Sequence, residues 1–91
     1  MNLNQKVKFA ETVFSQEVDG EMVLLDMNSE NYFGLDETGT AIWQAMQKTG
    51  SLQDVYEEML EQYEVEPEVL EQDILNFVEN LVESGLVSVK K

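Results

Sequence analysis

The stretch NSENYFGLDETGTAIW, residues 28–43, contains the point at which the sequence changes from the pattern of a strand to that of a helix. In its first half Tyr32 and Gly34 fall on one face of an extended chain, and Phe33 and Leu35 fall on the other. This period of two is typical of a β-strand, whereas the residues that follow repeat with a helical period. The stretch therefore predicts a short strand that is followed directly by a helix.

Two more strands are predicted before this one. The dipeptide Asp19-Gly20 is typical of a tight hairpin turn, and it separates the apolar-rich runs 12–18 and 21–27. The polar segment 28–31 then predicts a second turn. The segment 1–8 shows little pattern and is expected to be loose.

Three helices are predicted after the third strand, each with a start signal or an end signal. These signals are Asp36 and Gly50 for the first helix, Ser51 for the second, and Pro67 and Gly85 for the third. In the first helix Ile42, Trp43 and Met46 form an apolar patch that is expected to lie in the core. Residues 86–89 are expected to form a closing strand or a tail. The predicted fold is therefore α+β, a three-stranded antiparallel sheet followed by three helices, arranged as a winged helix-turn-helix in one domain over residues 1–91.

The composition argues against most kinds of catalytic or nucleic-acid-binding protein. The chain has 91 residues with no His and no Cys, so the usual general base, the thiol nucleophile and the thiolate zinc site are all missing. Nineteen Asp and Glu face five Lys and no Arg, which gives a net charge of -14 and no cationic patch for a phosphate backbone. We therefore expect a protein that is not an enzyme, needs no cofactor and binds no nucleic acid.

No targeting or membrane segment is evident in the sequence. No apolar run approaches the roughly 20 residues of a membrane span, and the N-terminal residues lack the apolar region of a signal peptide. The expected location is the cytoplasm, without membrane association.

A calcium-binding loop is the main alternative for the polar turn between the second and third strands. If Asp26 is the first position of a twelve-residue loop, then Glu37 is the twelfth and Asn31 is the sixth. The sixth position of such a loop requires glycine for a sharp turn, and a helix must precede the loop, whereas a hairpin arm precedes it here. The sequence favours an ordinary polar turn with no metal.

The third predicted helix has a mixed flank beside its apolar stripe. The flank contains Val69, Asp73, Asn76 and Asn80, so it combines one apolar residue with short polar ones. Such a face is either ordinary surface or one wall of a shallow groove, and the pattern alone leaves both alternatives open.

An ordered set of residues at characteristic spacings runs from the second predicted strand to the end of the third helix. Its members are Leu25, Tyr32, Leu35, Asp36, Gly39, Ile42, Trp43, Asp73, Phe77, Leu81, Gly85 and Leu86. This set resembles the PqqD family, the recognition elements of ribosomally synthesised and post-translationally modified peptides. The resemblance covers about residues 18–87 and differs from the usual family pattern mainly at Asp36, where Asn is common and also caps helices.

The resemblance implies a protein that binds the leader segment of a precursor peptide and presents it to a separate modifying enzyme or leader peptidase. The leader would add as a strand to the third strand and lie against the third helix, which agrees with the short third strand. The peptide-binding residues implied are Asn31, Tyr32, Phe33, Gly34 and Leu35 on the strand, and Val69, Asp73, Asn76, Phe77 and Asn80 on the helix.

The pathway is less closely defined than the binding mode. The form YFGLDETG followed by IW is most similar to members from lasso-peptide clusters, so lasso-peptide biosynthesis is favoured. The alternatives are a peptide chaperone in pyrroloquinoline quinone biosynthesis and a non-catalytic subunit that binds a folded protein. A winged helix that binds DNA has the same outline, but the acidic charge argues against it.

Overall fold

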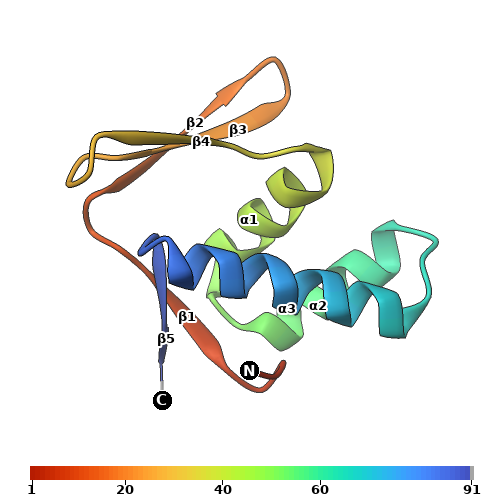
Figure 1. Ribbon diagram of the computed structural model, residues 1–91. Helices are drawn as coiled ribbons and strands as arrows, with labels where there is room; N and C mark the ends of the chain where they lie inside the picture. The colour runs from red at the N-terminus through yellow and green to blue at the C-terminus, as the bar shows by residue number, and fades with distance from the viewer. Residues whose placement is uncertain (91) are drawn as a thin grey trace.

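The computed structural model describes residues 1–90, which form two small sheets and three helices (Figure 1). The elements, in chain order, are β1 Lys6–Phe9, β2 Val13–Val18, β3 Glu21–Asp26, β4 Asn31–Gly34, α1 Glu37–Thr49, α2 Leu52–Gln62, α3 Pro67–Glu83 and β5 Val87–Lys90. Strands β2, β3 and β4 form one antiparallel sheet in that order, and β1 pairs with β5 in the other. The predicted α+β fold, with a three-stranded sheet followed by three helices, is confirmed.

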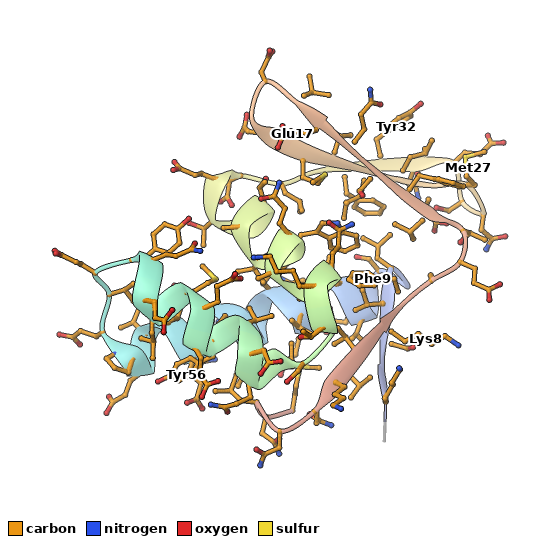
Figure 2. The ribbon with its side chains drawn as sticks, turned by 180° about the vertical axis from the view of Figure 1, so that it is seen from behind. Lys8, Phe9, Glu17, Met27, Tyr32 and Tyr56 are labelled. Carbon is orange, nitrogen blue, oxygen red and sulfur yellow. The ribbon has the colours of Figure 1, made fainter. Side chains whose placement is uncertain are left out.

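The prediction of a loose N-terminal segment is wrong from Lys6 onward. Strand β1 pairs antiparallel with β5 from the other end of the chain, so that Lys6 lies opposite Lys90. Val7 is buried, and the ring of Phe9 lies edge-on to the ring of Trp43 with 4.8 Å between the ring centres. Figure 2 shows Phe9 directed toward the helices. Two apolar side chains on one face of a four-residue segment therefore fix this strand to the core.

The helix boundaries follow the predicted capping residues. The Asp36 side chain accepts a hydrogen bond of 2.7 Å from the backbone N–H of Gly39, and the Ser51 side chain accepts one from Asp54 at the start of α2. Gly50 adopts the left-handed conformation, with φ of 75°, that ends α1. Helix α3 begins at its proline, as predicted from the fixed φ of that residue.

The core lies among the three helices and the two-stranded sheet. The three-stranded sheet contributes only Met22 and Leu24 to the buried apolar residues among positions 1–90. The other buried apolar residues are Val7, Ile42, Trp43, Ala45, Met46, Leu52, Val55, Met59, Leu70, Ile74, Val78, Leu81, Leu86 and Val87. The prediction that Ile42, Trp43 and Met46 anchor α1 in the core is confirmed.

A buried threonine joins the three-stranded sheet to the helices. The hydroxyl oxygen of Thr40 on α1 accepts a hydrogen bond of 2.9 Å from the backbone N–H of Met22, and the hydroxyl donates to the carbonyl of Leu35 at 3.4 Å. One side chain therefore links the first turn of α1 to β3 and to the residue after β4. This link fixes the position of β4 relative to the helices (Figure 1).

Candidate functional site

Strand β4 lies at the edge of the three-stranded sheet in the part of the chain that the structure describes. On its paired side Phe33 lies opposite Leu24, and the backbone N–H of Leu35 donates to the carbonyl of Met22 at 2.9 Å. Backbone groups in an antiparallel strand alternate in direction, so Phe33 bonds to β3 like Leu35 does. The N–H and C=O groups of Tyr32 therefore point away from the sheet. The N–H and C=O groups of Gly34 also point away from the sheet. Tyr32 and Gly34 therefore form an edge that can accept another strand.

The end of β4, the start of α1 and the middle of α3 meet at one glycine. A Cβ atom at Gly39 would lie 3.1 Å from a ring carbon of Phe77 and 3.5 Å from the Cβ of Leu35. Because glycine lacks that atom, the Phe77 ring of α3 can approach the first turn of α1 closely. The side chains of Leu35, Phe33 and Phe77 are all half-buried against the core. The structure thus brings Leu35, the residue after β4, close to Phe77 of α3.

The polar flank of α3 lies on the surface. Asp73, Asn76 and Asn80 are exposed, as is Val69, which has 51% of its surface accessible. The side-chain oxygen of Asn76 accepts a hydrogen bond of 2.9 Å from the amide of Gln72, so a ligand must compete for it. Four of the five predicted helix residues are thus exposed, and Asn76 already has a partner on its own helix.

A hollow of about 400 Å³ lies at the N-terminal end of α3. Its lining combines apolar residues with two carboxylates, Glu37 and Asp73. The other lining residues are Thr38, Met59, Tyr63, Val65, Val69 and Leu70. The lining comes from all three helices and from the connection before α3, whereas β4 contributes nothing to it. The predicted residues Val69 and Asp73 therefore share this hollow.

The carboxylate of Asp26 orders the turn that leads into β4. It accepts hydrogen bonds of 3.0 Å each from the backbone N–H of Asn28 and from the hydroxyl groups of Thr12 and Ser29. These bonds, led by the one from Asn28, lower the pKa of Asp26 below its ordinary value, although burial acts in the opposite direction. The ionised side chain thus fixes the turn at the start of β4. Within residues 1–90, no group of three or more acidic side chains is placed to hold a metal ion.

The charge around the predicted site is acidic. Lys6, Lys8 and Lys90 lie on the two-stranded sheet, and Lys48 on α1 forms an exposed ion pair with Glu58 of α2. The lysines of residues 1–90 thus lie on elements other than β4, whereas Glu30 directly precedes this strand. None of the helices in this part of the chain has the length and apolar character needed to span a membrane.

Comparison with known proteins assigns the family. The model of the family described as "Coenzyme PQQ synthesis protein D (PqqD)" matches residues 21–87, which include β3, β4 and all three helices. The chain belongs to the PqqD family. No curated protein matches the sequence.

Two solved structures resemble this PqqD-family chain over most of their length. One is described as "TbiB1 in Complex with the TbiA(beta) Leader Peptide" and is 28% identical to this chain. The similarity covers 89% of this chain and 94% of the other, with a TM-score of 0.85. The other is described as "Lasso peptide synthetase B1 complexed with the leader peptide" and is 31% identical to this chain. The similarity covers 91% of this chain and 98% of the other, with a TM-score of 0.83. Both resemble this chain in fold and in sequence.

Several residues of the hollow beside α3 are not among the predicted site residues. Glu37 and Thr38 belong to the first turn of α1, and Tyr63 and Val65 lie in the connection between α2 and α3. The signal in the sequence is a tyrosine and a valine in a connection otherwise made of acidic residues. That these side chains face α1 depends on how the helices cross, which a periodic pattern does not specify.

Proposed function

We propose that this PqqD-family chain binds the leader segment of a ribosomally synthesised precursor peptide and presents it to a separate modifying or leader-cleaving enzyme. Lasso-peptide biosynthesis is the favoured pathway, and the chain itself performs no catalytic step. The observation that carries the proposal is the edge of β4, where Tyr32 and Gly34 direct their backbone groups outward. The two similar structures support it, since each is described as a complex with a leader peptide.

The arrangement of side chains around β4 suits an extended peptide. Main-chain hydrogen bonds to Tyr32 and Gly34 would supply affinity, and pockets for alternate side chains would supply specificity. On the helix side the peptide would meet the half-buried ring of Phe77 and the exposed Asp73. A leader residue with an apolar stem and a cationic end would fit the hollow that contains Asp73 and Glu37.

A matched pair of substitutions at Gly34 tests the strand addition. Gly34→Pro removes the outward N–H, and an edge strand tolerates proline where that group faces away from the sheet. Gly34→Ala keeps the N–H, and its added methyl group meets no atom within 4 Å. We expect the proline variant to bind a synthetic peptide with the sequence of the cognate leader about tenfold more weakly, and the alanine variant to bind like the wild type.

Calorimetric titration measures both affinities, and circular dichroism checks that both variants are folded. The amide signals of Tyr32 and Gly34 should also shift when the wild type is titrated. Wild-type affinity in a folded Gly34→Pro variant, together with unshifted amide signals at both residues, would place the peptide elsewhere.

Two substitutions on α3 test the helix side of the groove. Asp73→Ala removes a carboxylate that could pair with a cationic leader residue and should weaken binding by about 1–3 kcal/mol. Asn76→Ala should have a smaller effect, because the Asn76 oxygen already accepts a hydrogen bond from Gln72. The control is Glu57→Ala on the exposed surface of α2, which should leave the leader affinity unchanged. Equal affinities in all three variants would remove α3 from the site.

A second candidate function is peptide binding in pyrroloquinoline quinone biosynthesis, which the description of the family model favours. The two candidates differ in the precursor that binds and in the enzyme that follows. A short precursor gene beside genes for a transglutaminase-like protease and an asparagine-synthetase-like cyclase would decide for the lasso pathway. Titration with the precursor of each pathway checks the assignment directly.

A further inference from the structure

The outer face of the three-stranded sheet, on the side away from α1, carries a row of apolar side chains. Phe14 lies opposite Leu25, and Leu25 lies opposite Tyr32, so the row crosses all three strands. The exposed fractions are 59% for Phe14 and 72% for Tyr32. Val23 lies beside Leu25 on the same face of β3, and Met27, the residue after β3, is also exposed.

Most of the large exposed apolar side chains of residues 1–90 lie on this outer face. Phe14, Val18, Met27 and Tyr32 belong to it or to its margin. The remaining ones are Met1, Tyr63 and Val69, and the last two line the hollow beside α3. Figure 2 shows Tyr32 and Met27 at the end of the molecule that the three-stranded sheet forms. A contiguous exposed apolar surface of this kind marks a contact surface for another molecule.

The outer face is also hollowed. A depression of about 350 Å³ is lined by Phe14, Ser15, Gln16, Val23, Leu25 and Tyr32. A neighbouring depression is lined by Leu25, Met27, Glu30 and Tyr32. The two share Leu25 and Tyr32, so one apolar surface continues across the face and can accept bulky side chains from a partner.

The charged residues that border this face distinguish between two partners, a second copy of this chain and a protein with positive charge. Glu30 lines one depression, and the hollow at the hairpin end of the sheet is lined by Asp19, Glu21 and Asp36. The lysines of residues 1–90 lie on β1, β5 and the end of α1. Two copies of the chain joined through this face would bring carboxylates against carboxylates, which is unfavourable. A partner with Lys or Arg around an apolar centre is complementary.

We propose that the outer face of the sheet is the docking surface for the enzyme that receives the precursor, through an apolar patch with a rim of Lys and Arg. This inference rests on the proposed function, because it takes the partner to be that enzyme. The geometry links the two sites at Tyr32 and Gly34, whose backbone groups face the edge while their side-chain positions face outward. An enzyme on the outer face would lie directly beside a peptide added to β4.

Three variants test the proposal by separating enzyme binding from leader binding. Phe14→Ser removes an exposed aromatic side chain on β2, the strand farthest from β4 in the sheet. Glu30→Lys reverses a bordering charge, and Glu57→Lys makes the same change on α2 as a control. The probes are the purified cognate leader peptidase and a synthetic peptide with the sequence of the cognate leader, each titrated separately at low and high salt.

We expect Phe14→Ser to weaken peptidase binding at least about tenfold, because aromatic residues dominate contact energies, and to leave the leader affinity unchanged. Glu30→Lys should weaken peptidase binding about threefold and reduce its salt dependence, whereas Glu57→Lys should do neither.

Three results would overturn the proposal. They are wild-type peptidase affinity in Phe14→Ser, no peptidase binding by the wild type, and a dimer of this chain, seen by sedimentation, that Phe14→Ser abolishes. Failure of the leader to bind the wild type would instead count against the proposed function, and Phe14-dependent binding of the peptidase would still stand.

Discussion

The helical part of the molecule and the three-stranded sheet use their apolar side chains in opposite ways. The helices, together with β1 and β5, bury most of theirs, and residues such as Ile74 and Val78 are fully covered. The sheet buries Met22 and Leu24 and leaves Phe14 and Tyr32 largely exposed. Burial of apolar area is the main source of stability, so the helical part determines whether the chain is folded. The sheet is then available for contacts with other molecules.

The largest effect on the free energy of unfolding is expected from the removal of an apolar side chain in the helical part. The same kind of removal in the sheet serves as the comparison. Ile74→Ala in α3 should lower the free energy of unfolding by about 2–5 kcal/mol, because it leaves a cavity in the core. Phe14→Ala on the outer face of the sheet should change it by about 0.5 kcal/mol or less. Urea denaturation followed by circular dichroism measures both. Similar losses in the two variants would show that the sheet also contributes to the core.

An intermediate effect is expected at the hydrogen bond that joins the two parts. Thr40→Val keeps the shape of the side chain but removes the acceptor for the buried backbone N–H of Met22. Leaving that donor without a partner should cost about 1–3 kcal/mol. The control is Thr49→Val, whose hydroxyl accepts a hydrogen bond in an exposed position and should matter less. Equal losses in the two variants would mean that the sheet is held by its other contacts.

The smallest effect is expected at the turn before β4, and it should depend on pH. The pKa of Asp26 is lowered in the folded chain, so its ionised form adds stability above the pKa of the unfolded chain. That contribution is lost as the pH falls through the lower, folded value. Asp26→Asn keeps the shape but removes the charge, so its deficit in the free energy of unfolding should be present at pH 7 and shrink toward pH 3. Urea denaturation at several pH values measures this difference, and a constant deficit would contradict the prediction.

The sequence predicted the elements that have strong local signals. The hairpin at Asp19-Gly20, the cap at Asp36 and the glycine at position 50 each act within a few residues, and each appears where it was expected. Strand β1 was missed because its partner is the last strand of the chain, and only Val7 and Phe9 indicate it. A pairing between distant segments leaves little trace in a local pattern.

The strand and the helix that form the candidate site could be predicted, but the directions of their individual backbone and side-chain groups could not. The flank of α3 follows from helical spacing, whereas the edge at β4 was implied by the resemblance to the PqqD family. The direction of the backbone groups of Tyr32 and Gly34 depends on the register with β3, which only the structure supplies. The hollow containing Glu37, Tyr63 and Asp73 needs the crossing of three helices and was not foreseen.

The pairing of β1 with β5 has a consequence for the way the chain folds as it is synthesised. The hairpins of β2, β3 and β4 join neighbouring segments and can form early, whereas β1 emerges first and has no partner strand until the C-terminal residues are made. The two-stranded sheet is therefore completed only when β5 is made, although the backbone N–H of Val7 can already donate to the carbonyl of Gly50. The edge of β4 can thus form before the two-stranded sheet closes over the core.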